Sequence, residues 1–214
     1  KDKFRYKLFG RFRGRKKNHL VLQRDLDRYI FNKKTDINSH NYNILDIGSG
    51  SGENAIFLST NKINSKIITC ELFEDGNYNL CHQIIKNKIE NISLYQGNVL
   101  EFFDTIQPLL MFDEIWILFP DPWPKIRHHK RRLIQNSFFK KINPFLKKTG
   151  KLMIASDSDS YIESILKTIY DMQDLFYWNN QALPQWNYNI LNLPKTKFYK
   201  KAEKSNRNSM FFEL

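Results

Sequence analysis

The chain has 214 residues, of which 41% are apolar, and this is enough for one domain with a buried core. Its 34 lysines and arginines outnumber 22 aspartates and glutamates. The resulting net charge of +12 predicts an anionic partner, either nucleic acid or an acidic membrane surface. No apolar run approaches the length of a transmembrane helix, and the basic N-terminus lacks the apolar segment of a secretory signal. Cys70 and Cys81 lack metal-ligand spacing, so we expect reduced, buried thiols, no bound metal and a cytoplasmic protein.

Residues 1–20 form a basic segment with interleaved aromatic residues, nine lysines or arginines and a single acid. This composition is typical of a solvated arm or of an arm that orders on RNA, and the pairing of basic with aromatic residues favours RNA. A short helix is expected over residues 20–31, followed by a polar linker over 32–42. Residues 1–32 would then precede a domain that spans residues 43–214.

From residue 43 the sequence alternates apolar runs with helical patterns. Strands are predicted at residues 44–47, 66–70, 92–95, 112–119, 151–155 and 209–214. Helices are predicted at 53–59, 75–88, 130–145 and 161–172, and a polar loop at 179–197. This alternation predicts an α/β fold: one Rossmann-like, doubly wound domain with a mostly parallel sheet and helices on both faces.

Polar residues follow or end several predicted strands, at the edge where ligands bind in such sheets. They are Asp46, Glu71, Asn98, Asp121 and Asp157. A lone acid at a strand end is usually a cap or turn residue, but five in succession predict a ligand site.

A glycine-rich turn, Gly48-Ser-Gly-Ser-Gly52, follows Asp46. Gly48 and Gly50 let a ligand approach the backbone, and Glu71 lies where an acid accepts from ribose hydroxyls. The glycine-rich turn and Glu71 together fit either a dinucleotide or S-adenosylmethionine. The position of Asp46 ahead of the glycines favours S-adenosylmethionine. Asp46 would face the cationic amino acid end of this cofactor, and Asn98 would hydrogen-bond to its adenine. A βα turn with a capping acid is the structural alternative.

The segment Phe119-Pro-Asp-Pro-Trp-Pro-Lys125 follows the fourth strand and leads into a basic run over residues 127–132. Its prolines fix φ, remove backbone donors and favour extended conformations for the residues before them. The turn is therefore expected to present Asp121 and Trp123 on a stiff support, with Trp123 either stacked on a base or structural.

These stretches resemble the signature of the bacterial tRNA (guanine-N7-)-methyltransferase family. The resemblance rests on the proline turn with its basic run, on Thr196-Lys-Phe198, and on Phe9-Gly-Arg-Phe-Arg-Gly-Arg15. It covers nearly the whole chain and implies transfer of a methyl group from S-adenosylmethionine to N7 of the variable-loop guanine (position 46) of tRNA. We expect a monomer or weak homodimer that uses no metal.

The resemblance also implies roles for individual residues. Asp121 falls on the catalytic position. Cofactor-binding positions are Asp46, Gly48, Gly50, Glu71, Asn98 and Asp121. Substrate-binding positions are Lys125, Asp157, Thr196, Lys197, Phe198 and Tyr199. RNA-contact positions are Arg127, His128, His129, Lys130, Arg131 and Arg132.

The chain departs from the family pattern mainly on the substrate side. Tyr199 stands where a Glu is usual, Asn98 where Asp is common, and Ser158 where Trp is frequent. The segment after Phe198 lacks the usual glycines.

Guanine N7 carries a free lone pair, so catalysis requires placement and stabilisation of positive charge rather than a general base. Asp121 would supply the carboxylate, and Asp157 would accept from the guanine N1–H and amino group. The arginines and lysines around His128 disfavour a charged imidazole.

Two other functions remain open. The Pro-Asp-Pro-Trp sequence also resembles the turn of enzymes that methylate exocyclic amines of bases. Tyr199, which replaces a carboxylate, is compatible with a non-catalytic RNA-binding relative.

Overall fold

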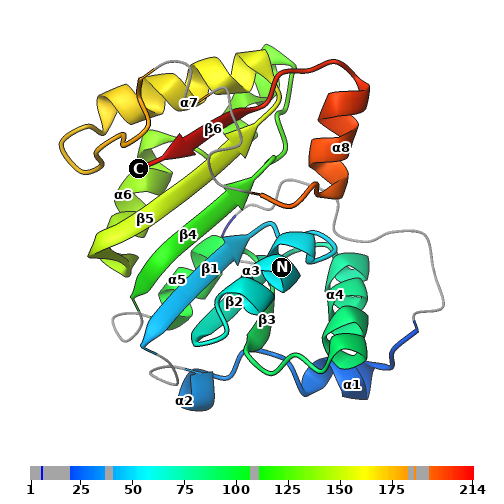
Figure 1. The fold of residues 1–214 in the computed structure, drawn as a ribbon. Coiled ribbons are helices and arrows are strands. Elements are labelled where there is room, and N and C mark those ends of the chain that lie inside the picture. Colours follow the sequence, from blue (N-terminus) through cyan, green and yellow to red (C-terminus); the bar gives the residue numbers. More distant parts are fainter. Residues whose placement is uncertain (1–5, 7–19, 37–40, 107–110, 183–185, 187–192) are drawn as a thin grey trace. The chain divides into compact units, whose positions relative to one another are not determined.

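The structure, a computed structural model, describes residues 6, 20–36, 41–106, 111–182, 186 and 193–214 (Figure 1). The predicted arm therefore lies outside the described residues except for Tyr6 and Leu20, and it stays a prediction. The strands of the described part form one sheet in the order β3-β2-β1-β4-β5-β6. Their bounds are β1 Tyr42–Ile47, β2 Ser65–Glu71, β3 Ile92–Gln96, β4 Phe112–Leu118, β5 Leu146–Ser156 and β6 Met210–Glu213. The chain clusters into two compact units, residues 1–113 and 114–214.

In the first unit β1, β2 and β3 pair in parallel, with Ile44 opposite Ile67 and Ile67 opposite Ile92. These strands are almost continuously apolar because parallel strands are buried on both faces, and Ile44 and Ile67 are fully buried. The helices of this unit are α1 Gln23–Asp27, α2 Lys33–Asp36, α3 Glu53–Asn61, α4 Glu74–Asn87 and α5 Val99–Ile106. Cys70 and Cys81 are buried free thiols, as predicted.

The helix predicted over residues 20–31 is wrong beyond Asp27. Residues 29–31 instead pair with the outer edge of β3. Leu94 donates its N–H to the Tyr29 carbonyl at 2.7 Å, and Phe31 donates to the Leu94 carbonyl at 2.8 Å. Pairing satisfies edge groups of β3 that a continued helix would leave unpaired.

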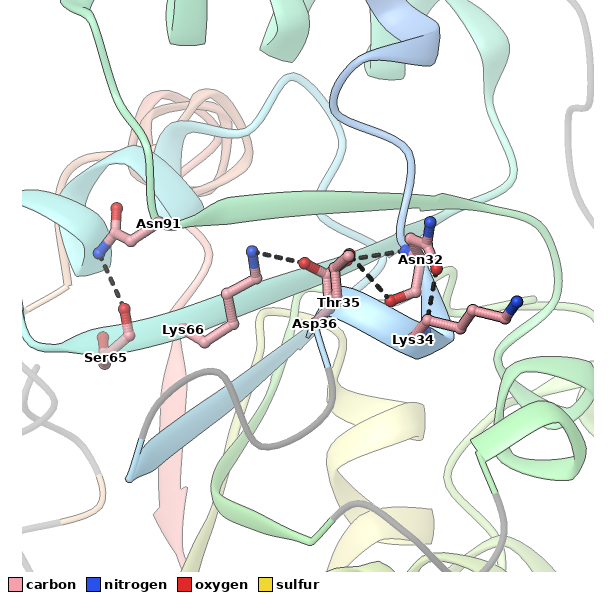
Figure 2. Close-up of polar contacts among 7 residues, drawn as sticks. All are labelled: Asn32, Lys34, Thr35, Asp36, Ser65, Lys66 and Asn91. Atoms are coloured by element: carbon pink, nitrogen blue, oxygen red, sulfur yellow. Dashed lines mark hydrogen bonds and ion pairs between the residues drawn. The ribbon is translucent and has the colours of Figure 1, made fainter.

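The predicted linker contains α2, which a buried ion pair ties to the sheet. Lys66 Nζ on β2 lies 2.9 Å from Asp36 Oδ1, and the two side chains are only 8% and 11% exposed (Figure 2). The other Asp36 oxygen accepts from the Asn32 N–H at 2.8 Å. This additional bond matters because a buried ion pair persists only when its remaining polar groups are satisfied.

In the second unit β5 and β6 pair antiparallel, with Ser156 opposite Met210. The sheet is therefore mostly parallel with one antiparallel strand at its edge, and the predicted fold class is confirmed. α7 Asp159–Asp171 buries Tyr161 and Ile165 completely, and Phe212 of β6 is also fully buried.

The single helix predicted over residues 130–145 is wrong. The structure has a 3-10 helix, η1 Ile126–Arg131, then α6 Asn136–Ile142 and a second 3-10 turn, η2 Asn143–Phe145. Arg132 and Gln135 have extended backbones between them. Arg132, which lies in this break, is buried.

The helices α5 and α8 Lys197–Lys204 were not predicted. Within the described residues, no helix combines the length and apolar character needed to span a membrane.

Candidate functional site

The glycine-rich turn of the first unit depends on left-handed backbone. Gly48, Gly50 and Gly52 have φ of 71°, 56° and 83°, a region that other residues rarely adopt. A Cβ at Gly52 would also lie 2.3 Å from Leu80 Cδ1, and a Cβ at Gly76 of α4 would lie 2.4 Å from the Gly50 carbonyl oxygen. Glycine at these positions lets α4 pack directly against the turn.

Asp46 lies on β1 immediately before this turn and is 2% exposed. Oδ1 accepts from Asn54 Nδ2 at 3.2 Å, whereas Oδ2 has no hydrogen-bond partner among the described residues. Burial, with a smaller contribution from nearby Glu71, raises the pKa of Asp46 to about 7. Ser49 Oγ in the turn is likewise buried without a partner in the described part of the chain. Buried polar atoms without partners indicate a place where a ligand supplies the missing bond.

Glu71 ends β2 and holds the turn from the other side. Oε2 accepts from the Gly50 N–H at 2.8 Å and Oε1 from the Phe73 N–H at 2.7 Å. Each carboxylate oxygen has two acceptor sites, so Glu71 keeps capacity for a hydroxyl donor.

Asn98 caps the start of α5. Its Oδ1 accepts from the Leu100 N–H at 2.8 Å at the start of α5, as a helix-capping side chain does. We expected this oxygen to accept from an adenine amino group. An amide oxygen has two acceptor sites, so the cap does not exclude this contact, and Nδ2 can also donate to a ring nitrogen.

An open cavity of about 690 Å³ lies at the other end of these strands, around Lys66 and Asp36 near the start of β2 and β3. The glycine turn, by contrast, follows the carboxyl end of β1. Because Lys66 and Asp36 are already paired with each other, we assign this cavity no ligand.

In the second unit the proline turn is strained rather than extended. Phe119 and Trp123 precede Pro120 and Pro124, yet their φ values are 50° and 44°. The predicted extended backbone is therefore wrong at both residues. Non-glycine residues adopt this region at a cost of about 1–3 kcal/mol, and such strain clusters at active sites and ligand clamps.

Side-chain contacts account for the strain. The Phe119 ring stacks on Tyr199 at 5.9 Å between centroids, and its N–H donates to the Ala155 carbonyl at 2.8 Å. Trp123 lies 5.0 Å from the Arg131 guanidinium and packs edge-on against His128. Trp123 is thus held by protein groups, which favours the structural alternative for this side chain.

Asp121, between the two strained residues, is exposed. Packing of the turn around it nevertheless raises the pKa of its carboxyl above the ordinary value. A partly desolvated carboxylate that remains accessible suits an electrostatic role beside a substrate.

Arg132 was predicted to contact RNA, but its side chain is 3% exposed, which contradicts that role. Nε donates to the Pro122 carbonyl at 2.8 Å, and Nη1 to the carbonyl of Ser160 on α7 at 2.7 Å. Nη1 and Nη2 also donate to the hydroxyls of Ser164 and Ser160. The guanidinium lies over the Tyr161 ring at 4.9 Å. Arg132 therefore clamps the Asp121 turn to α7.

The other members of the basic run differ in exposure. Lys125, Arg127 and Lys130 are exposed, whereas His128, His129 and Arg131 are half-buried. Desolvation and then the surrounding cations lower the pKa of His128, the direction expected from the sequence. A neutral imidazole at this position adds no charge for phosphates, so the three exposed cations are the stronger RNA-contact candidates.

The predicted substrate residues 196–199 form the start of α8. Thr196 is the buried N-cap, and its hydroxyl oxygen accepts from the Tyr199 N–H at 3.3 Å. The Tyr199 ring lies between Phe119 and Phe211. Tyr199 thus replaces a family carboxylate with an aromatic contact that joins α8 to the proline turn.

Asp157, just after β5, is paired with Arg207. The Nε and Nη2 atoms of Arg207 lie 2.8 and 2.7 Å from Asp157 Oδ2, and the two side chains are 43% and 19% exposed. Both contacts use one oxygen, so Oδ1 remains the acceptor for a substrate. No spacing pattern in the sequence indicated Arg207, which lies 50 residues from its partner.

Known proteins resemble this chain in both sequence and fold. Residues 40–212 match a family model described as "Putative methyltransferase". Over 213 residues the chain is 30% identical to the tRNA (guanine-N(7)-)-methyltransferase of Wolbachia pipientis wMel, covering 97% of this chain and 92% of that protein. The chain belongs to the tRNA (guanine-N7-)-methyltransferase family.

Other relatives of this family differ in length. The tRNA (guanine-N(7)-)-methyltransferase of Corynebacterium diphtheriae is 36% identical over 126 residues, which are 59% of this chain and 49% of that protein. The chain thus spans about half the length of that relative. A solved structure described as an antibiotic-related methyltransferase aligns with a TM-score of 0.60 at 17% identity, over 86% of this chain and 94% of that one. This similarity shows a shared fold.

Proposed function

We propose that this chain transfers a methyl group from S-adenosylmethionine to N7 of a guanine in tRNA, the variable-loop guanine at position 46. The observation that carries the proposal is Asp121 on a strained turn that Arg132 clamps to α7. Membership in the family supplies the reaction, and Asp121 occupies the position that the family resemblance assigns to catalysis.

The first unit fits S-adenosylmethionine. When bound, this cofactor supplies an electrophilic methyl group on a sulfonium. Asp46 would accept from the cofactor's ammonium group, because its Oδ2 is buried and has no partner among the described residues. Glu71 would accept from the ribose hydroxyls, and Asn98 would donate to the adenine ring. Gly48 and Gly50 would let the cofactor approach the backbone.

The second unit supplies the groups for guanine. Asp121 would stabilise the positive charge that develops on the purine as N7 is methylated. Asp157 would accept from the guanine N1–H and amino group, held in place by Arg207. Lys125, Arg127 and Lys130 would bind phosphates, which gives affinity rather than base identity. No residue need act as a general base, because guanine N7 already carries a free lone pair.

The remaining proposals concern the setting of the protein. We propose a cytoplasmic enzyme with tRNA as its partner, as a monomer or weak homodimer. The high positive charge favours association with RNA.

Incubation of the chain with unmodified tRNA and labelled S-adenosylmethionine tests the proposal. Strand cleavage specific for N7-methylguanine should map the product to the variable loop, and Asp121→Asn should keep tRNA affinity while losing most turnover. Product at N6 or N2 would identify an exocyclic-amine methyltransferase. tRNA binding with no cofactor binding in calorimetry would identify a non-catalytic relative.

A further inference from the structure

The exposed face of α8 carries four lysines at the i, i+3, i+4 and i+7 spacing that aligns side chains along one face of a helix. We call this set the lysine stripe: Lys197, Lys200, Lys201 and Lys204. All four are exposed, while the other face holds buried Ala202 and half-buried Tyr199. Each lysine therefore points away from the protein core.

Both ends of α8 are fixed beside the predicted substrate residues of the second unit. Near its start, Tyr199 stacks on Phe119 of the proline turn. Just after its end, Arg207 pairs with Asp157 and donates its N–H to the Ala202 carbonyl at 3.0 Å. Within this unit, Figure 1 shows α8 at the end where β5 terminates. The lysine stripe therefore has a set position next to the predicted guanine contacts.

The charge of α8 has little internal compensation. Residues 195–204 contain five lysines and one acid, Glu203. Glu203 is already paired with Lys195 at 2.8 Å. Among the described residues, no ion pair joins Lys200, Lys201 or Lys204 to a carboxylate. These three lysines of the stripe are thus available to an external anion.

We propose that the lysine stripe is a second phosphate-contact surface for tRNA, in addition to the exposed cations of the basic run. This inference rests on the proposed function. The stripe extends over about 10 Å of helix, since α-helices rise about 1.5 Å per residue, and this length matches a few consecutive phosphates of a strand. Phe198, 51% exposed on the same helix, offers a ring on which a base can stack.

The substitutions Lys200→Ala, Lys201→Ala and Lys204→Ala together test the stripe, because alanine preserves the helix while removing three charges. A matched control combines Lys140→Ala, Lys148→Ala and Lys167→Ala, which removes the same charge from exposed positions of the same unit. Lys148 lies near the start of β5, at the opposite end from Asp157.

The dissociation constant for unmodified tRNA is measured for each full-length protein between 50 and 200 mM salt. Each phosphate contact contributes about 0.7–0.9 to the slope of log affinity against log salt. The triple substitution of Lys200, Lys201 and Lys204, called the stripe variant, should therefore have a slope that is smaller in magnitude by about 2–3. Across this fourfold rise in salt, wild-type affinity should fall about 30-fold more than that of the stripe variant. The control should keep a slope close to the wild-type value.

Equal slopes for the stripe variant and the control would overturn the inference and leave the proposed function intact. If wild type binds tRNA without methylating N7, the proposed function fails, while the slope still decides the stripe. Binding of wild type and of the stripe variant to phosphatidylcholine vesicles that contain phosphatidylserine is measured as well. Loss of vesicle binding by the stripe variant with an unchanged tRNA slope would assign the stripe to a membrane surface.

Discussion

Replacing Asp46 with Asn should stabilise the cofactor-free protein while weakening cofactor binding. The folded-state pKa of Asp46 is about 7 against 3.8 for an ordinary aspartate. At 1.36 kcal/mol per pKa unit, this shift corresponds to about 4 kcal/mol of destabilisation when the buried carboxyl is ionised. Asn has nearly the same shape, can still accept from Asn54, and carries no charge.

The sign of the pH dependence follows from linkage. A folded pKa above the unfolded value means that the native state binds more protons between these values. Stability is then full below pH 4, falls as pH rises toward 7, and stays low above it. The gain from Asp46→Asn should therefore be near zero at pH 4 and approach its maximum, up to about 4 kcal/mol, at pH 8.

Urea unfolding at pH 4, 6 and 8 measures this difference, with Asp174→Asn, a substitution of an exposed aspartate, as the control. Calorimetry with S-adenosylmethionine at pH 8 should show affinity reduced about 10- to 100-fold, the value of a hydrogen bond to a charged group. A stability change that is the same at every pH would refute the assigned pKa. Unchanged cofactor affinity would refute the role of Asp46 at the ammonium group.

Three further substitutions concern the second unit. Arg132→Ala should cost about 2–3 kcal/mol in urea unfolding, because it removes a buried guanidinium that donates to two carbonyls and two hydroxyls. Arg132→Lys should restore only part of this stability, since an ammonium lacks the planar fork. An effect below 1 kcal/mol would contradict the clamp. Asp157→Asn should lower kcat/KM for tRNA about 10- to 100-fold with cofactor affinity unchanged in calorimetry, because an amide has a single acceptor oxygen and cannot serve both Arg207 and the guanine. Normal turnover would remove Asp157 from the base site. Tyr199→Phe should keep kcat and thermal stability. Tyr199→Ala should lower stability by about 1 kcal/mol, because the stack on Phe119 is lost. Equal behaviour of the two variants would show that the stack is unimportant.

Most strands could be predicted closely because buried parallel strands are nearly continuous apolar runs. Residues 66–70 were expected, and the strand is Ser65–Glu71. β5 is the exception: residues 151–155 were predicted, but it begins at Leu146, and its first half is not buried. The helix α5 was missed although Val99, Phe102, Phe103 and Ile106 carry the helical spacing, so the sequence did contain that signal. The lysine spacing of α8 also carries this signal, but residues 199–204 were assigned to no element, and only Lys197 fell in the predicted loop and in the short motif.

Other features had no local signal. Arg132 looks like its basic neighbours in sequence, and its partners Ser160 and Ser164 follow 28 and 32 residues later. The left-handed φ of Phe119 and Trp123 goes against the local effect of the following prolines, and only tertiary contacts with Tyr199 and Arg131 account for it. The prediction of a glycine-rich turn flanked by Asp46 and Glu71 needed no such contacts, because glycine and strand-end positions are visible in the sequence.

The pairing of residues 29–31 with β3 has a consequence for how the protein behaves at high concentration. An open strand edge is a template on which another chain can add, and β3 would present one if Tyr29 and Phe31 did not bond to Leu94. The segment that leads from the basic N-terminal residues into the domain therefore also blocks strand-to-strand association. Shortening the chain from its N-terminus past Phe31 would expose this edge and favour aggregation, whatever its effect on RNA.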